Sequence, residues 1–260
     1  MNLDEFYSLK SNLGLMWMGN DGWILNLWGT IIATDLDLHS QDRVSLPANV
    51  DIVKMAGHIQ AVFISHEHGD HFNPDTCLFL QNNSDCLFVI PKNCYREAVK
   101  IGLSDERLII ATPRIPFQLL GLNIQPVRAL HGHYLGSVFR EANLDDCGYI
   151  IGKDDFSLYQ PGDTVLLDEH FDMKNIDVLF FSPTEHNMHI DNSVHFIQMI
   201  KPRFIVPQHY DSYKVTPENA FWTRGFPDDV YNRLTDTERS SFIKLPQGQP
   251  KRLSFCPPGA

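Results

Sequence analysis

Short apolar runs, separated by polar turns, recur along the whole chain and predict an α/β fold. Near the start, three such runs occupy residues 13–18, 23–27 and 30–34. Gly-Asn-Asp-Gly and Trp-Gly turns divide these runs, as in a meander of β-hairpins. Residues 61–64, Ala-Val-Phe-Ile, form a short continuous apolar run, which is typical of a buried parallel strand.

Helices and further strands alternate through the rest of the chain. Residues 38–59 are expected to form a loop with a short helix. The Asn-Pro pair at residues 73–74 predicts a helix start, because proline is tolerated in a first helical turn. Further helices are predicted at 93–102, where a glycine ends the helix, and at 192–200. Further strands are predicted at residues 86–90, 107–111, 119–130, 147–151, 156–160, 176–182, 203–206 and 241–245.

The length of 260 residues fits one large α/β domain. Each half of the chain has strands first and a helix later, so two αβ halves are expected. We therefore predict a single domain over residues 1–260, with halves of roughly 1–135 and 136–260.

A histidine-rich stretch, Ser-His-Glu-His-Gly-Asp-His, follows directly after the apolar run at 61–64. His66 and His68 are two residues apart, so a helix would point them to different faces. On a loop that leaves a strand, with Gly69 allowing a tight turn, they can converge on one point. Imidazoles and carboxylates at this density suit zinc, iron or manganese, which predicts a metal-binding loop.

Three later residues complete the candidate set, because each follows a strand-like segment and strand ends carry functional loops in open α/β sheets. The predicted metal ligands are His66, His68, Asp70, His71, His131, Asp163 and His209. His133 follows the same strand as His131 and stays an alternative, although His131 is the first residue past the apolar run.

The seven ligands divide into two sites for two divalent metal ions, either zinc or manganese, with iron as a third option. The first two histidines of the loop and His131 hold one ion, leaving a position open for water, as in catalytic sites. The last two residues of the loop and His209 hold the other ion, and Asp163 bridges both. Such a pair would share a hydroxide that attacks an electrophile.

Two residues are candidates for catalytic roles beside the metal ions. Asp70 can orient the nucleophile or relay a proton. His186, on the loop after another strand, can donate to a developing oxyanion, with a solvated polar loop as the alternative. Asp35 closes a strand near the predicted site and can hydrogen-bond a ligand imidazole, with an ordinary turn residue as the alternative.

Composition narrows the range of partners. The net charge of −11, with no basic stripe, disfavours a nucleic-acid partner. No apolar run can span a bilayer and no signal peptide is evident, so no membrane partner is expected. Five cysteines without a CxxC pair fit a reduced, cytoplasmic protein. Aromatic residues in the tail, at 221, 222 and 226, could form a homo-oligomeric interface.

These motifs resemble those of the metallo-β-lactamase fold hydrolases. The HxHxDH signature begins at His66, and matching positions follow in order at His131, Asp163 and His209. The resemblance extends over residues 14–213 and implies an αββα sandwich: two mixed sheets packed face to face, with helices outside, and a dinuclear metal site.

Within that superfamily, the chain looks most like the L-ascorbate-6-phosphate lactonase branch. The stretches that carry this likeness are residues 16–19, 90–92, 102–107 and 205–211. The likeness implies manganese and the lactone of a sugar-acid phosphate.

We therefore expect a metal-dependent hydrolase that opens a lactone or ester of a small, sugar-acid-like substrate, with or without a phosphate group. The alternatives are a phosphodiesterase or amidohydrolase of the same fold, or a non-catalytic metal-binding sensor. A charged substrate needs a basic partner, for which Arg128, Arg140, Lys214 and Arg224 are the candidates.

Overall fold

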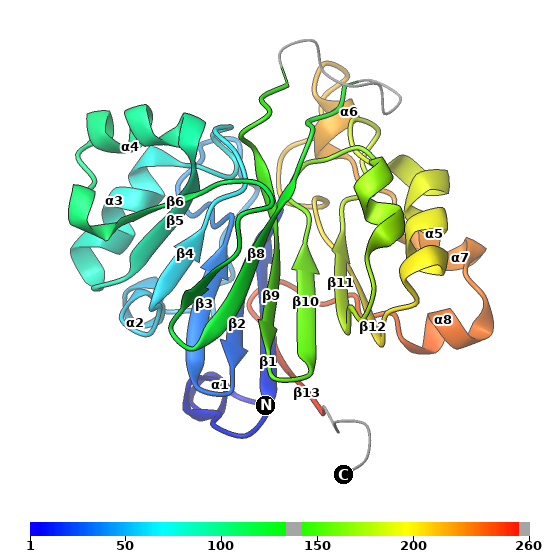
Figure 1. Cartoon of the computed structure of the whole chain (residues 1–260), viewed down its shortest axis with the longest axis horizontal. Coiled ribbons are helices and arrows are strands. Elements are labelled where there is room, and N and C mark those ends of the chain that lie inside the picture. Colours follow the sequence, from blue (N-terminus) through cyan, green and yellow to red (C-terminus); the bar gives the residue numbers. More distant parts are fainter. Residues whose placement is uncertain (134–141, 255–260) are drawn as a thin grey trace. The chain divides into compact units, whose positions relative to one another are not determined.

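A computed structural model describes residues 1–133 and 142–254, so that Arg140 lies outside the described residues (Figure 1). The chain divides into two units, each built on one sheet. The first unit comprises Met1–Ala111 and Leu245–Ala260, and the second unit comprises Thr112–Lys244. The division therefore lies at Ala111 instead of near residue 135, and the C-terminal segment returns to the first unit.

The sheet of the first unit is mixed and has the strand order β13-β1-β2-β3-β4-β5-β6. Strands β1, β2 and β3 form the predicted antiparallel meander. Strands β3 to β6 run parallel to one another. The buried parallel strand predicted before the histidine loop is confirmed as β4, which lies between β3 and β5. The strands are β1 (Leu13–Gly19), β2 (Gly22–Leu27), β3 (Thr30–Thr34), β4 (Ala61–Phe63), β5 (Leu87–Pro91), β6 (Leu108–Ala111) and β13 (Pro250–Leu253).

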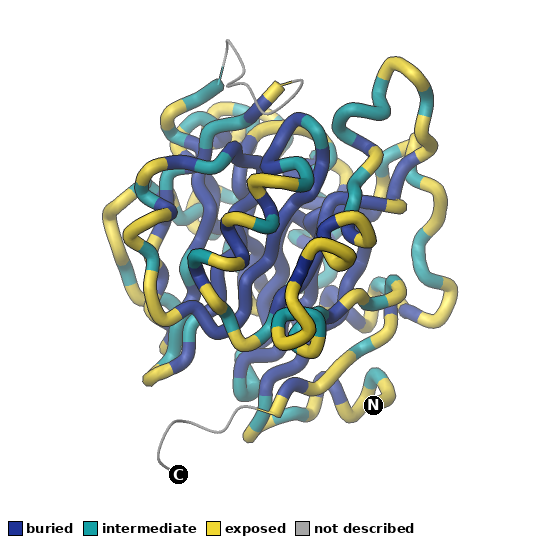
Figure 2. Tube along the Cα trace, turned by 90° about the vertical axis from the view of Figure 1, so that its right-hand side faces the viewer, coloured by how far each residue is buried: buried dark blue, intermediate teal, exposed yellow. Residues whose placement is uncertain are grey.

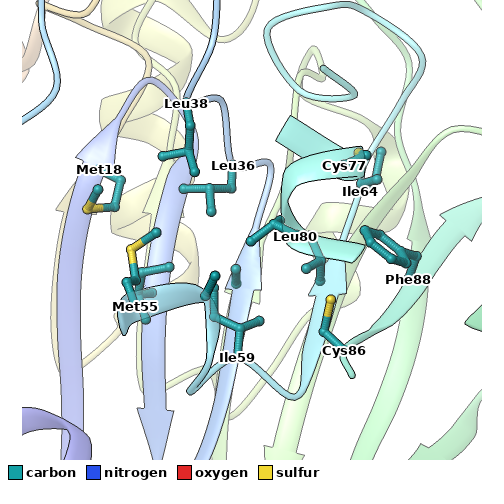
Figure 3. Packing of buried hydrophobic residues seen from close by; sticks show 14 of the residues in the cluster. Met18, Leu36, Leu38, Met55, Ile59, Ile64, Cys77, Leu80, Cys86 and Phe88 are labelled. Atoms are coloured by element: carbon teal, nitrogen blue, oxygen red, sulfur yellow. The ribbon is translucent and has the colours of Figure 1, made fainter. Parts of the chain in front are cut away.

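Local sequence signals account for the helices of the first unit. Asn73 caps α3 by accepting the Thr76 N–H at 2.9 Å, and Gly102 ends α4 in the left-handed region at φ 96°. Helices α2 and α3 place Met55 and Leu80 over the sheet, where they belong to the same apolar cluster as Ile64 (Figure 3). The helices are α1 (Leu3–Ser8), α2 (Ile52–Ala56), α3 (Pro74–Asn83) and α4 (Tyr95–Ile101), with 3-10 turns η1 (Lys92–Cys94) and η2 (Asp105–Arg107).

The sheet of the second unit is also mixed, with the order β12-β11-β10-β9-β8-β7. Strands β10, β11 and β12 are parallel, and β9 lies antiparallel to both β8 and β10. As a result, β8 points the same way as β10, β11 and β12, and their carboxyl ends share one edge. The strands are β7 (Phe117–Leu119), β8 (Leu122–Arg128), β9 (Cys147–Lys153), β10 (Phe156–Gln160), β11 (Val178–Phe181) and β12 (Phe204–Pro207).

Helix α5 (His189–Ile200) covers the apolar core of the second unit with one face. Phe196, Ile197 and Ile200 are buried, whereas Asp191 and Asn192 are exposed, as expected for an amphipathic helix. Figure 2 shows the same contrast along the chain, with buried strands and helices whose outer turns are exposed. The remaining elements are η4 (Asp168–Asp172), α6 (Ala220–Thr223), α7 (Pro227–Arg233) and α8 (Asp236–Ser240). Among the described residues, no helix combines the length and apolarity needed to cross a membrane.

Two strand predictions need correction. The strand predicted at 119–130 is interrupted, because Leu120 and Gly121 both have positive φ and form the turn between β7 and β8. The strand predicted at 241–245 is wrong, since Phe242 makes only an isolated bridge to Ile205. The C-terminal strand is instead β13, which begins at Pro250 and pairs with β1 at the edge of the sheet.

Candidate functional site

In the first unit, parallel pairing of β3 and β4 brings Asp35 and Ser65 to the same sheet edge. Asp35 is buried, adopts the left-handed region at φ 39°, and accepts the Ser65 N–H through Oδ1 at 2.7 Å. A non-glycine residue in this conformation needs support from its surroundings, and the buried hydrogen bond supplies some of it. Asp35 therefore anchors the start of the histidine loop.

The other carboxylate oxygen of Asp35 orients His71. His71 Nδ1 lies 3.1 Å from Asp35 Oδ2, so we assign the ring proton to Nδ1. The lone pair of His71 is then on Nε2, which lies 3.4 Å from Asp70 Oδ2. A carboxylate behind an imidazole is the usual arrangement that fixes a histidine for metal binding.

The first two histidines of the loop also converge, as predicted. His66 Nδ1 lies 2.9 Å from Ser65 Oγ, and His66 Nε2 lies 3.0 Å from His68 Nδ1. The His71 and Phe72 N–H groups both donate to the His68 carbonyl, which turns the loop back on itself. The ring centroids of His66 and His71 are consequently only 4.1 Å apart.

Asn20 is a contact of the histidine loop that the sequence did not reveal. It lies in the turn between β1 and β2 at φ 49° and donates from Nδ2 to Asp70 Oδ2 at 3.0 Å. The turn was predicted as a hairpin connection, but no pattern linked it to a residue 50 positions later. Asn20 is thus a positioning residue for Asp70.

In the second unit, the loops after β8 and β10 are tied together. The Leu130 N–H donates to Thr164 Oγ1 at 3.0 Å, and the Val165 N–H donates to the Leu130 carbonyl at 3.0 Å. This pairing places His131 Nε2 3.4 Å from Asp163 Oδ2. His131 therefore lies beside Asp163, whereas His133 of the same loop is exposed.

Asp163 is buried at the centre of the second unit's cluster. Its Oδ2 atom lies 2.8 Å from His186 Nε2 and 3.2 Å from His209 Nε2. Its Oδ1 atom accepts a hydrogen bond from Asn187 Nδ2 at 2.8 Å. Asn187, like Asn20, was not predicted, because no ligand-type spacing distinguishes it.

His209 occupies this position because Gln208, the residue before it, is hydrogen-bonded to residues of two neighbouring strands. The Gln208 N–H donates to the Phe181 carbonyl, and Gln208 Nε2 donates to Gln160 Oε1 at 2.7 Å. His209 itself is fully buried at φ 58°. Strand β12 and the buried amide contacts of Gln208 thus position the His209 imidazole beside Asp163.

His186 has both ring nitrogens directed at protein groups. Its Nδ1 atom lies 3.3 Å from the Phe221 carbonyl and its Nε2 atom faces Asp163. Burial holds the pKa of the His186 imidazole below its usual value, and the Asp163 carboxylate opposes that effect. Its sequence-based role as an oxyanion donor stays a prediction.

The donor sets of both units fit a divalent transition-metal ion. In the second unit, one ligand atom from each of His131, Asp163 and His186 lies within 4.8 Å of the other two. In the first unit, two imidazole nitrogens, from His66 and His68, are 3.0 Å apart. Imidazole and carboxylate donors together suit zinc, manganese or iron. How the seven ligands are shared between ions stays a prediction.

The candidate basic residues are occupied elsewhere or exposed. Arg128 Nε donates to Glu169 Oε1 at 2.8 Å, and the Arg224 guanidinium lies over the Phe226 ring. Lys214 is exposed. None of these described contacts identifies a site for a phosphate or carboxylate group.

The family of the chain follows from comparison with known proteins. Residues 31–210 match the model of the beta-lactamase superfamily domain. The chain belongs to this superfamily. This membership and the two mixed sheets with their helices confirm the predicted fold class.

Curated members of similar sequence are named UPF0173 metal-dependent hydrolases. One from Carboxydothermus hydrogenoformans is 26% identical over 170 residues, which cover 59% of this chain and 68% of that protein. Another from Heliobacterium modesticaldum is 27% identical over 195 residues, which cover 68% of this chain and 74% of that protein. These names agree with metal-dependent hydrolysis, but neither name mentions a lactone as the substrate.

Two solved structures share the fold of this chain at low sequence identity. Igni18, a metallo hydrolase from Ignicoccus hospitalis, has a TM-score of 0.74 at 20% identity, covering 95% of this chain and all of that chain (100%). An isothiocyanate hydrolase from Delia radicum gut bacteria has a TM-score of 0.72 at 15% identity, covering 93% of this chain and 99% of that chain. The narrower likeness to the L-ascorbate-6-phosphate lactonase branch is not confirmed by these relatives.

Proposed function

We propose that this chain is a metal-dependent hydrolase that opens an ester or lactone bond in a small, sugar-acid-like molecule. Metal dependence is supported by the superfamily and by the names of the curated relatives. The observation that carries the proposal is the buried Asp163 carboxylate, which has the Nε2 atoms of three histidines within 3.4 Å of one oxygen. Imidazole and carboxylate donors of this kind suit zinc, manganese or iron.

Two divalent ions would be held by the seven predicted ligands, His66, His68, Asp70, His71, His131, Asp163 and His209. When bound, these ions supply water activation and polarise the electrophilic carbon. The contribution of the protein is to hold the ligands before the ions arrive. Asp35 does so for His71, and the Leu130–Thr164 pairing does so for His131.

Asp70 is proposed to orient the nucleophile and to relay its proton. The Asp70 side chain is 17% exposed, in contrast to the fully buried His71 side chain, so a substrate and its water can reach it. Asn20 holds Oδ2 of Asp70 at 3.0 Å and thereby fixes the direction of the carboxylate. A carboxylate held in one orientation is suited to proton transfer.

An ester or lactone substrate is favoured by the resemblance of four stretches of the chain to a lactonase branch. A structural neighbour named isothiocyanate hydrolase also acts, by its name, on a small electrophilic carbon compound. An activated carbonyl carbon is therefore the first substrate class to test. Phosphodiesters and amides are the next classes.

Turnover and metal content test this proposal together. The purified protein is analysed for zinc, manganese and iron, and then assayed with each metal on a panel of lactones, aryl esters and bis-p-nitrophenyl phosphate. We expect turnover of an ester or lactone that a chelator abolishes. His66→Ala is expected to remove it, while His195→Ala, an exposed histidine on α5, leaves it intact.

A metal-loaded protein that cleaves nothing in the panel would overturn the enzymatic proposal and favour a metal-binding sensor. Turnover confined to the phosphodiester would keep the hydrolase but replace the substrate class. Turnover that survives complete metal removal would exclude metal-dependent hydrolysis.

A further inference from the structure

A cleft beside α1 gathers positive charge in a chain that is acidic overall. The cleft has a volume of about 840 Å³ and lies between α1, residues 9–12 and the edge strand β13. Three basic residues line it, Lys10, Lys251 and Arg252, together with the acidic residue Glu5. The whole chain has 32 acidic and 21 basic residues, so this lining reverses the average composition. We propose that the cleft binds a small organic phosphate.

Within the described part of the chain, the three basic side chains lack a partner of opposite charge. All three residues are exposed, and none of their side chains makes a hydrogen bond or ion pair with another described residue. Lys54 on α2, in contrast, is paired with Asp4 at 2.6 Å. The Glu5 carboxylate already accepts the Asn2 N–H at 3.1 Å. Like charges in one cleft repel one another, and a bound anion relieves that repulsion.

The walls of the cleft are fixed by packing and hydrogen bonds. Phe6 of α1 is fully buried, and its carbonyl accepts a hydrogen bond from Asn26 Nδ2 at 2.7 Å. Its ring packs so closely on β1 that a Cβ atom on Gly14 would lie 2.7 Å from it. The stem of Lys10 lies along the turn between β2 and β3, where a Cβ atom on Gly29 would be 3.1 Å from Lys10 Cδ. A site whose walls are already ordered loses less conformational freedom on binding.

The charge and size of the cleft select the class of ligand. Three positive side chains and one negative side chain leave two positive charges, which match a phosphate monoester of about −1.5 to −2 better than a single carboxylate. Arg252 can bind two phosphate oxygens at once through its planar guanidinium. The Ser11 hydroxyl accepts from Asn12 Nδ2 at 3.3 Å and can donate its proton to the ligand. The volume lies within the range of about 300–1,000 Å³ of small-molecule sites.

A small ligand is favoured over a long polyanion such as a nucleic acid. The net charge of −11 repels a polyanion that extends along the surface. A phosphate ester inside the cleft interacts chiefly with charges within about 8–10 Å, because salt screens those farther away. The local excess of basic side chains therefore decides its binding.

The cleft is separate from the histidine loop of the first unit. Helix α1 and strand β13 contact each other at one end of the sheet (Figure 1). Residues 9–12 of the cleft precede β1, whereas Asn20, which contacts Asp70, follows it. The seven residues of β1 separate the two places by about 20 Å. A ligand of the cleft therefore does not occupy the candidate metal site of this unit.

Isothermal titration calorimetry of the full chain at low salt tests the inference. The probes are glycerol 3-phosphate, acetate and heparin, each titrated into the wild type, Lys10→Gln and Arg252→Gln. Lys174→Gln is the matched control, because Lys174 is exposed in the second unit and its loss changes the net charge equally. His66→Ala identifies any phosphate that binds at the metal ligands instead.

We expect glycerol 3-phosphate to bind the wild type, Lys174→Gln and His66→Ala alike. Lys10→Gln and Arg252→Gln are each expected to weaken its binding by about 10-fold, since each removes a charge-assisted hydrogen bond. Added salt should weaken binding by the wild type.

The inference is overturned if the wild type binds no glycerol 3-phosphate, or if both cleft variants bind it like the wild type. Acetate that binds as tightly as the phosphate ester overturns the phosphate assignment, and binding of heparin alone overturns the small ligand. Binding that only His66→Ala removes belongs to the metal ligands and also overturns the inference. None of these outcomes depends on hydrolysis, so the proposed function and this inference fail or succeed separately.

Discussion

Several histidines of the candidate site are oriented by the group that their Nδ1 atom contacts. These partners are the Asp35 carboxylate for His71, the Ser65 hydroxyl for His66 and the Gly132 carbonyl for His131. In each case the contact fixes the ring and leaves Nε2 as the outward-facing nitrogen. Residue types therefore suggest a metal site, but the hydrogen-bond partners make its ligand atoms converge.

Substitution of Asn20 tests this positioning at a residue that binds no metal itself. Asn20→Gly removes the donor to Asp70, and glycine tolerates the left-handed backbone of the turn. We expect the catalytic rate to fall by about 10-fold to 100-fold, with the melting temperature nearly unchanged. Steady-state kinetics and a thermal melt of the same preparation measure both quantities.

Asn20→Asp is the matched variant, because it replaces the donor with a carboxylate that faces Asp70. It is expected to lower the rate more than Asn20→Gly, owing to repulsion between the two carboxylates. If Asn20→Gly keeps the full rate, the contact with Asp70 is dispensable and the assigned role is wrong.

His170 gives a prediction for pH dependence away from the metal-ligand cluster. It is fully buried, accepts the Leu167 N–H at Nδ1, and donates from Nε2 to the Tyr159 hydroxyl. Burial lowers the pKa of His170 to about 4, and the charge of Arg128 adds to the effect. The folded protein therefore holds this ring neutral, whereas the unfolded chain takes up a proton below about pH 6.5.

The stability that neutral His170 contributes is present above pH 6.5 and is lost as the pH falls towards 4. We expect the wild type to lose about 3 kcal/mol more unfolding free energy between pH 7 and pH 4 than His170→Gln. Urea denaturation at several pH values, followed by tryptophan fluorescence, measures the difference. His195→Gln, an exposed control, should follow the wild type, and equal losses in all three proteins would contradict the assignment.

At the residue scale, the sequence pointed to the candidate ligands but not to the residues that support them. His66, His131 and His209 each stand at the end of an apolar run, so the strand-end rule finds them. Asn20 and Asn187 have no comparable signal, because asparagine in a turn is common and their carboxylate partners are distant in sequence. Long-range hydrogen bonds of this kind become visible only in the fold.

At the element scale, buried strands and capped helices could be predicted, whereas edge strands could not. Strand β4 has a continuous apolar run, and α3 has an Asn-Pro start, so each carries a physical signal. Strand β13, Pro-Lys-Arg-Leu, is polar and starts with proline, which is permitted only because it lies at an edge. Its pairing with β1 is a tertiary contact that overrides local preference.

The loop after β8 offers a prediction about how closely elements pack in the second unit. A Cβ atom on Gly132 would lie 1.6 Å from the His186 carbonyl oxygen and 2.7 Å from Val165. Gly132→Ala must therefore push this loop away from the loop that carries His186. We expect a loss of about 1–3 kcal/mol or more in unfolding free energy, and weaker metal binding because His131 moves with the loop.

The matched control is Gly57→Ala at the end of α2, where a Cβ atom would meet nothing closer than 3.6 Å. It should leave metal affinity unchanged and alter stability by less than about 1 kcal/mol. Urea denaturation and a zinc titration of both variants provide the comparison. If both alanine variants have the same stability and the same zinc affinity, the loop that carries Gly132 moves without displacing His131.

At the scale of the whole molecule, the sequence predicted two αβ halves but not their exact extent. Residues 112–128 belong to the second unit because β7 pairs with β8, and β8 in turn pairs with β9. The tail from Leu245 onwards belongs to the first unit. Neither assignment follows from local composition. The turn before β7 has no residue pattern that marks a boundary between units, and no local pattern shows that a C-terminal segment pairs with the first unit's sheet.

Metal removal is the prediction that concerns the whole chain. An ion that binds only the folded protein stabilises it by about 2.7 kcal/mol at one hundred times its dissociation constant. For a chain of this size, that energy corresponds to about 5–10 °C in melting temperature. We therefore expect chelation to lower the melting temperature by this amount and zinc or manganese to restore it. Calcium should not restore it, since calcium prefers oxygen ligands.

Variants make the metal effect specific to the candidate ligands. His209→Ala is expected to melt at a lower temperature than the wild type and to respond less to added metal, because one buried donor is missing. His195→Ala, exposed on α5, should show the full response. If chelated and metal-supplied wild-type protein melt alike, the buried histidines around Asp163 are hydrogen-bonding groups of the core, and metal-dependent hydrolysis loses its structural basis.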